Sequence, residues 1–177
     1  MAKKPRKTLG AADSPQVLSL IKLIRTQSRE TIANWCMDYA EKYILPIYEK
    51  HCPGDERLHH ALLAARDWMK GLNKLPYVKN IILKEAHAAA REAEDKPAAQ
   101  AAARAVGQAA SCIHTPAHSL GIVFYGAAAL AYDRVGVDES PETYDRIAKE
   151  ICADMEAALR AAAVENEPNP ARINWYC

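Results

Sequence analysis

The sequence predicts an all-α protein, a single-domain bundle of about seven helices packed antiparallel or orthogonally. Apolar residues recur at spacings of three and four along most of the chain, whereas the alternating pattern of strands hardly appears. Serine or threonine followed by proline marks several helix starts. The 177 residues fall within the usual span of one domain and suffice to bury a core without disulfides or metal ions.

Three serines mark helix starts, because a serine side chain can accept a backbone N–H group that is free at a helix N-terminus. Ser14-Pro15 opens the first predicted helix, which continues to about Gln27. Ser28 opens the second helix. Ser140-Pro141 opens the last one, whose apolar face continues to Leu159.

Proline and glycine set the shape of the second and third predicted helices. Pro46 lies inside the second helix and removes a backbone hydrogen bond, so we expect a kink near Ile44. That helix stops at Pro53-Gly54, and Asp55 caps the third helix, which ends at Gly71-Leu72-Asn73. The third helix carries an apolar stripe: Leu58, Ala61, Leu62, Ala65, Trp68, Met69 and Leu72.

Two alanine-rich helices follow, over residues 77–94 and 97–113. The short link Glu94-Asp95-Lys96 makes them antiparallel neighbours, and small side chains allow their axes to approach closely. Thr115 and Pro116 then open a sixth helix; the alternative is one long helix kinked at Pro116. The facing alanines are Ala86, Ala89, Ala90, Ala93, Ala98, Ala101, Ala102, Ala105 and Ala109.

The predicted bundle domain covers residues 14–165, with a tail at each end. Residues 1–13 form a disordered basic tail that contains Lys3, Lys4, Arg6 and Lys7. Residues 166–177 form a non-helical tail, and its apolar side chains are expected to dock on the bundle. These side chains are Ile173, Trp175 and Tyr176.

The charge balance favours neither a nucleic-acid partner nor a membrane. The chain has 23 basic and 22 acidic side chains and a formal net charge of +1. The longest apolar runs are shorter than the roughly 20 residues of a membrane span. No apolar region follows the basic N-terminus, so the chain lacks the pattern of a secretory signal and is expected in the cytoplasm.

The five cysteines predict reduced thiols, since their number is odd and none forms a C-x-x-C pair. Cys36, Cys112 and Cys152 lie in apolar helical patterns and are expected in the core. Cys177 ends the chain and is expected to be exposed.

Polar residues interrupt the alanine-rich hairpin at two places. His87 and Arg91 are one helical turn apart, and Arg104 and Gln108 have the same spacing. Both pairs are expected to face one polar seam. The seam is either an internal network that fixes helix register or a pocket for a small ligand or partner.

His114 and His118 extend this candidate binding site. They are four residues apart, which is metal-ligand spacing on an unbroken helix, but Pro116 is expected to break the helix between them. We therefore predict no bound metal and no cofactor. We also predict no catalytic residue, because no thiol, base and acid come together and no glycine-rich phosphate loop is present.

A series of motifs lies between Trp35 and Tyr125. The motifs are Ala40-Glu41, Leu45-Pro46, Pro53-Gly54-Asp55-Glu56-Arg57, Ala64-Ala65-Arg66-Asp67-Trp68, Gly71, Ala86-His87-Ala88-Ala89-Ala90-Arg91, Ala102-Ala103-Arg104-Ala105-Val106-Gly107, His114 and His118-Ser119-Leu120-Gly121. In these motifs the chain resembles the bacterial immunity proteins of the Imm-5-like domain family. The chain departs from that family at two places: Glu56-Arg57-Leu58 stands where members have D-R-P, and Gly107-Gln108-Ala109 stands where they have G-H-A.

The resemblance implies a non-enzymatic protein that is made alongside a toxin and neutralises this cognate partner by direct binding. If the histidine replaced by Gln108 has a metal or catalytic role in the family, that role is in doubt here. Two other classes of function stay open. One is a metal-dependent hydrolase that uses His87, His114 and His118; the other is a homo-oligomeric structural protein, such as a homodimer, with Trp175 and Tyr176 in its interface.

Overall fold

Helices make up the regular structure of residues 5–175, the part of the chain that the computed structural model describes. This confirms the all-α prediction. About seven helical rods result, as predicted, because α2, η1 and α3 are continuous, as are α5, η2 and α6. In chain order the elements are α1 (Pro15–Ile24), α2 (Arg29–Tyr39), the π-helix η1 (Ala40–Ile44), α3 (Leu45–His51), α4 (Arg57–Met69), α5 (Leu75–Ile81), the π-helix η2 (Ile82–Ala86), α6 (His87–Glu92), α7 (Pro97–Ser111), the short 3₁₀-helix η3 (Pro116–His118), α8 (Ser119–Val135) and α9 (Pro141–Ala162).

The three predicted serine caps are present. The hydroxyl oxygen of Ser14 accepts the backbone N–H of Val17 at 3.3 Å. Ser28 and Ser140 accept the N–H groups three residues ahead of them, each at 3.1 Å. Each serine satisfies one of the donors that a helix N-terminus leaves free, which fixes where α1, α2 and α9 begin.

The disturbance predicted at Pro46 takes the form of a π-helical turn. Pro46 has no N–H group, so the carbonyl four residues earlier loses its helical partner. The turn widens, and the N–H of Leu45 bonds to the carbonyl of Ala40, five residues back. A second π turn, η2, ends where the N–H of His87 bonds to the carbonyl of Ile82.

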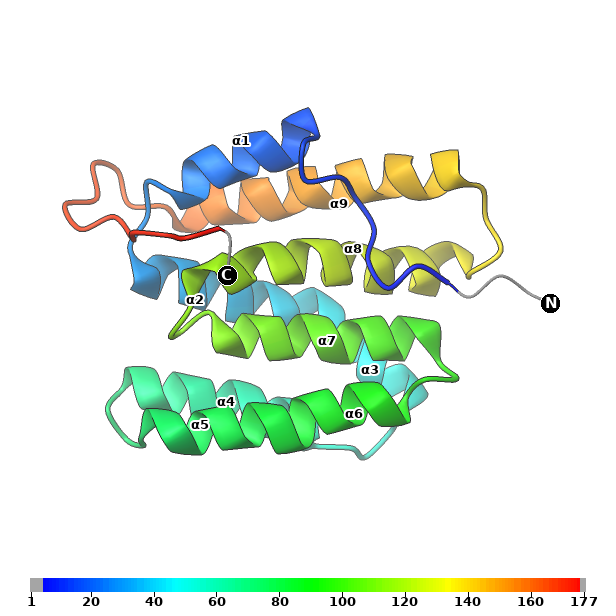
Figure 1. The fold of residues 1–177 in the computed structure, drawn as a ribbon, viewed down its shortest axis with the longest axis horizontal. Helices are drawn as coiled ribbons and strands as arrows, with labels where there is room; N and C mark the ends of the chain where they lie inside the picture. The colour runs from blue at the N-terminus through cyan, green and yellow to red at the C-terminus, as the bar shows by residue number, and fades with distance from the viewer. Residues whose placement is uncertain (1–4, 176–177) are drawn as a thin grey trace.

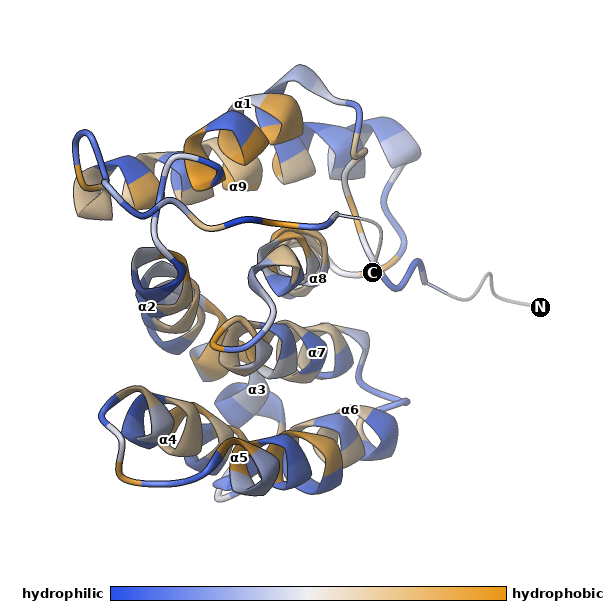
Figure 2. Cartoon of the chain, turned by 60° about the vertical axis from the view of Figure 1, so that its left-hand side comes forward, coloured by the Kyte–Doolittle hydropathy of each residue, from blue (hydrophilic) through white to orange (hydrophobic). Residues whose placement is uncertain are grey.

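The helices stack in layers around α7 (Figure 1). The buried helix α7 packs against α8 and α6 and contacts α2, α3 and α4. Outside this group, α9 packs against α1 and α8. The predicted alanine hairpin between α6 and α7 is present, and its facing alanines are buried. Apolar faces turn toward the interior and hydrophilic faces outward (Figure 2).

The third helix ends as predicted at Gly71, which adopts a left-handed conformation with φ of +75°. The N–H of Gly71 bonds to the carbonyl of Trp68, and that of Leu72 bonds to the carbonyl of Asp67. However, Leu72 is 71% exposed and does not belong to the apolar stripe. The left-handed turn carries it away from the buried face of α4.

The chain reverses after α7, so the alternative of one long helix kinked at Pro116 is wrong. The predicted sixth helix also differs in detail. Pro116 opens the 3₁₀-helix η3, and α8 begins only at Ser119. Thr115 makes no side-chain capping bond.

The N-terminal segment does not fit the expectation of a disordered tail over its described part. Leu9 is only 1% exposed, and its N–H donates to the carbonyl of Phe124 in α8 at 3.2 Å. The hydroxyl of Tyr132 donates to the carbonyl of Arg6 at 2.6 Å. Leu9, an apolar residue in a segment rich in lysine and arginine, thus anchors this segment to the helical bundle. With α1, α8 and α9 the segment encloses a cavity of about 440 Å³.

The C-terminal segment is non-helical over its described residues and returns to the bundle. The N–H of Ala171 donates to the carbonyl of Gln27 at 2.8 Å, and the side chain of Gln27 bonds to both backbone groups of Val164. Ile173 and Trp175 pack against the core, as predicted. Tyr176 and Cys177, for which docking and exposure are predicted, lie outside the described residues.

The predicted core cysteines are buried. Cys36 and Cys112 face each other, with 3.4 Å between their sulfur atoms. Burial raises the pKa of Cys36, and it raises that of Cys152 to about 11. Within residues 5–175, no helix is both long enough and apolar enough to cross a bilayer.

Candidate functional site: a histidine–arginine cluster

His87 is placed by two backbone features. The π turn η2 ends at His87 and sets the direction in which its side chain leaves the helix. Opposite it, α7 has Gly107, and a Cβ atom there would lie 3.3 Å from Cε1 of the His87 ring. The imidazole therefore occupies space that a larger residue at position 107 would restrict.

Gln108 is placed by a second helical glycine. A Cβ atom at Gly121 in α8 would lie 2.6 Å from Cδ of Gln108, a separation that packed atoms do not reach. Because Gly121 has no side chain, the amide group of Gln108 can lie directly against α8. There, Oε1 of Gln108 accepts a hydrogen bond from Nδ1 of His118 at 2.7 Å.

His114 stands beside His118 in the segment between α7 and α8. The two rings are 5.9 Å apart between centroids and meet edge to face. Both side chains are half-buried. Nδ1 of His114 is shielded from solvent and makes no hydrogen bond in the structure. Nδ1 of His114 is therefore an unsatisfied polar atom of the cluster.

Three cations surround these imidazoles. The Arg104 guanidinium lies 5.8 Å from the centre of the Tyr125 ring, a cation–π distance that fixes its position. Burial lowers the pKa of His87, and the charges of Arg91 and Arg104 lower it further. The structure thus brings both predicted pairs together.

The pKa values of His114 and His118 are lowered as well. Burial is the main cause for both. For His114 the charges of Lys79 and His118 add to the effect, and for His118 the charge of His87 does. A hydrogen bond, a ring contact and electrostatic interactions thus link all six predicted site residues, and the charge of Lys79, which the sequence analysis missed, acts on His114. We call these seven residues the histidine–arginine cluster: Lys79, His87, Arg91, Arg104, Gln108, His114 and His118.

The cluster does not have the arrangement of a metal site. Among the described residues, no three histidine, cysteine or carboxylate side chains are grouped so that they could hold a metal ion. Gln108 also occupies Nδ1 of His118. A hydrolase that uses His87, His114 and His118 as metal ligands would need these side chains to rearrange.

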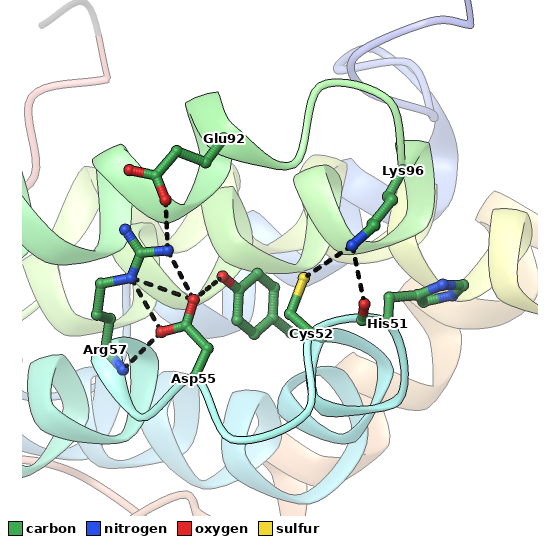
Figure 3. Close-up of polar contacts among 7 residues, drawn as sticks. His51, Cys52, Asp55, Arg57, Glu92 and Lys96 are labelled. Atoms are coloured by element: carbon green, nitrogen blue, oxygen red, sulfur yellow. Dashed lines mark hydrogen bonds and ion pairs between the residues drawn. The ribbon is translucent and has the colours of Figure 1, made fainter.

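A second polar network, which the sequence analysis also missed, joins the loop before α4 to α6 (Figure 3). Asp55 accepts hydrogen bonds from the Arg57 guanidinium at 2.6 and 2.9 Å and from the Tyr48 hydroxyl at 2.6 Å. Nη2 of Arg57 also bonds to Glu92 at 2.8 Å. The hydrogen bonds from Arg57, with a smaller contribution from Tyr48, hold the pKa of Asp55 well below its usual range. Asp55 and Arg57 are two positions apart in one motif, and this spacing is the sequence signal from which their ion pair could have been predicted.

The charged side chains of this network are paired with one another. Arg57 has carboxylates on two sides, and its hydrogen bonds to them raise its pKa. Nearby, Nζ of Lys96 donates to the carbonyl of His51 at 3.1 Å and lies 4.0 Å from Sγ of Cys52 (Figure 3). The arrangement clamps the loop between α3 and α4 against α6, which is a structural role.

A comparison with protein families gives a match that includes both the histidine–arginine cluster and the Asp55 network. A family model described as Imm-5 like putative immunity protein matches residues 22–158, well over half of the chain. The match spans the clamp at Asp55 and every member of the histidine–arginine cluster. We find no match among curated proteins or solved structures.

Proposed function

The chain belongs to the Imm-5-like family of immunity proteins, and from this premise we propose that it neutralises a cognate protein toxin by binding it directly, without catalysis. The family match over residues 22–158 is the observation that carries the proposal. It covers the helices from within α1 to within α9, so the family relation concerns the bundle itself rather than an appended segment.

The absence of catalysis is part of the proposal and is supported by the burial of three of the four described thiols, Cys52 being partly exposed. Cys36, Cys112 and Cys152 are buried. A raised pKa keeps Cys36 and Cys152 protonated, and a protonated thiol is a poor nucleophile. Within the cluster, His118 is hydrogen-bonded to the amide of Gln108 rather than to a nucleophile and a carboxylate.

The proposal includes a place of action and a second kind of partner. We propose that the chain acts in the cytoplasm of the bacterium that produces the toxin. A homodimer is proposed as well, because large apolar side chains such as Leu63, Leu72 and Tyr77 are exposed on or between α4 and α5. Sedimentation equilibrium of the purified chain measures this directly, and a single monomeric species would contradict the dimer.

Co-expression with the toxin encoded beside the gene tests the main proposal. We expect the chain to restore growth and to co-purify with the toxin in a fixed ratio, while the mass of the toxin stays unchanged. Growth arrest that persists beside the folded chain contradicts the proposal. Restored growth with a chemically altered toxin and no complex would indicate an enzyme instead.

A further inference from the structure

The cations of the histidine–arginine cluster differ from the partly buried arginines Arg57 and Arg66, each of which is paired with carboxylates. The chain as a whole carries a net charge of only +1. Elsewhere its partly buried arginines are neutralised: Arg57 pairs with Asp55 and Glu92, and Arg66 pairs with Asp38 and Glu41.

Within residues 5–175, by contrast, none of the ion pairs at 4.0 Å or less involves the three cations of the cluster. These cations are Lys79, Arg91 and Arg104. The three imidazoles beside them are also potential donors. The cluster is therefore rich in hydrogen-bond donors. Glu92 interacts electrostatically with Arg91, but its hydrogen bond goes to Arg57.

The partly buried members of the cluster have defined contacts before any partner arrives, whereas Lys79 and Arg91 are exposed. The side chains of the cluster come from three packed helices and the connection between α7 and α8. Gly107 and Gly121 make the room for His87 and Gln108, and Arg104 lies over Tyr125. Donors that are already oriented lose less conformational entropy on binding.

We propose that the histidine–arginine cluster binds an acidic segment of the partner protein, whose carboxylates accept hydrogen bonds from the arginines and the imidazoles. The proposal rests on the proposed function, since it names the chemistry by which the partner is recognised. Charge complementarity and the proposed protein partner together favour this occupant, because carboxylates are the acidic groups of proteins and arginine forks bind them well.

Proton uptake by the imidazoles on binding follows from the surroundings of the rings. In the free protein, burial and the nearby cations favour neutral histidines. Nδ1 of His118 already donates to Gln108, so Nε2 is the nitrogen that gains the proton. A carboxylate placed beside these rings offsets the repulsion from Arg91, Arg104 and Lys79, and it raises the histidine pKa values. Because the bound form holds more protons, affinity increases as pH falls from about 8 toward about 6.

The probe for this test is a hexa-aspartate peptide with blocked ends, titrated into the ¹⁵N-labelled full chain. The histidine ring signals are followed by nuclear magnetic resonance at several pH values. We expect the signals of His87 and His118 to shift saturably and their pKa values to rise. The Arg91→Gln, Arg104→Gln variant is expected to bind about tenfold more weakly. If that variant does not fold, the exposed Arg91→Gln change alone serves.

A matched control lowers the charge equally at another place. Arg146 and Arg160 are exposed on α9 and pair with Glu150 and Glu156. The Arg146→Gln, Arg160→Gln variant should bind the peptide as the wild type does. Equal weakening in both variants, or no histidine response, overturns the inference. Inorganic phosphate that matches the peptide in affinity also overturns it, because the site would then select oxyanions in general.

The cognate toxin separates this inference from the proposed function. If the toxin binds the wild type and the Arg91→Gln, Arg104→Gln variant equally, the inference fails and the proposed function stands. If the peptide binds as expected but the toxin does not, the carboxylate site stands and its assignment to a toxin partner fails.

Discussion

Two glycines decide where the polar side chains of the cluster can lie. The sequence pairs His87 with Arg91 and Arg104 with Gln108, because residues four apart share a helix face. It does not predict that Gly107 and Gly121 receive the side chains of neighbouring helices. That fact depends on how α6, α7 and α8 pack, and a glycine inside a helical pattern does not by itself show which side chain lies against it.

The Gly121→Ala substitution tests this account of Gln108. The added methyl group would displace the Gln108 amide and break its bond to His118, so we expect a loss of about 1–3 kcal/mol in the free energy of unfolding. In a Gln108→Ala background the space is free. The same change should then stabilise the protein by about 0.5–1 kcal/mol, because glycine is a poorer helix former than alanine.

Urea unfolding of the four proteins in this cycle gives both values. The sign reversal between the two backgrounds is the critical result. If Gly121→Ala destabilises both backgrounds equally, the methyl group clashes with something other than Gln108, and the positioning role of Gly121 is wrong.

The helices follow local signals closely, and their departures arise from contacts that are distant in sequence. Serine caps and the alanine hairpin are visible in the sequence because each depends on residues a few positions apart. Pro46 predicts a disturbance, but whether it becomes a kink or a π turn depends on the neighbours of η1. Nothing in residues 82–86 alone predicts η2. The clamp at Asp55 reaches α6 through the bond between Arg57 and Glu92, which are 35 positions apart, so the sequence pattern does not reveal it.

The Asp55→Asn substitution tests the clamp between the α3–α4 loop and α6. It removes the charge that Arg57 and Tyr48 bind, so we expect a loss of about 2 kcal/mol in the free energy of unfolding at pH 7. The pKa of Asp55 is lowered in the folded protein, so its ionised form contributes stability at pH values above the ordinary carboxyl pKa. This contribution is lost progressively as pH falls below about 4.

Denaturant unfolding at pH 7 and pH 3 measures the difference between wild type and variant, which should be smaller at pH 3. Asp138→Asn is a matched control, because Asp138 is exposed and lies outside the clamp. A difference that stays constant between the two pH values would show that the Asp55 charge does not stabilise the fold.

The bundle as a whole is completed by segments outside its helices. The charge pattern of residues 1–13 suggests a solvated tail, and only the position of Leu9 in the structure reveals an anchor. At the other end, Gln27 binds the backbone of residues 164 and 171. Both contacts cover helices whose apolar faces would otherwise be open, so the cooperative unit extends beyond the helical residues.

Leu9 and Leu72 offer a direct comparison between the anchored segment and an exposed turn. The Leu9→Ala change leaves a cavity between the segment and α8, so we expect a loss of about 2–4 kcal/mol in the free energy of unfolding. Leu72→Ala removes the same atoms from a side chain that is 71% exposed, and should cost at most about 0.5 kcal/mol. Hydrogen exchange gives an independent reading, because the Leu9 amide donates to the Phe124 carbonyl and should be protected. Similar losses in both variants together with rapid exchange at Leu9 would show that the segment does not stabilise the bundle.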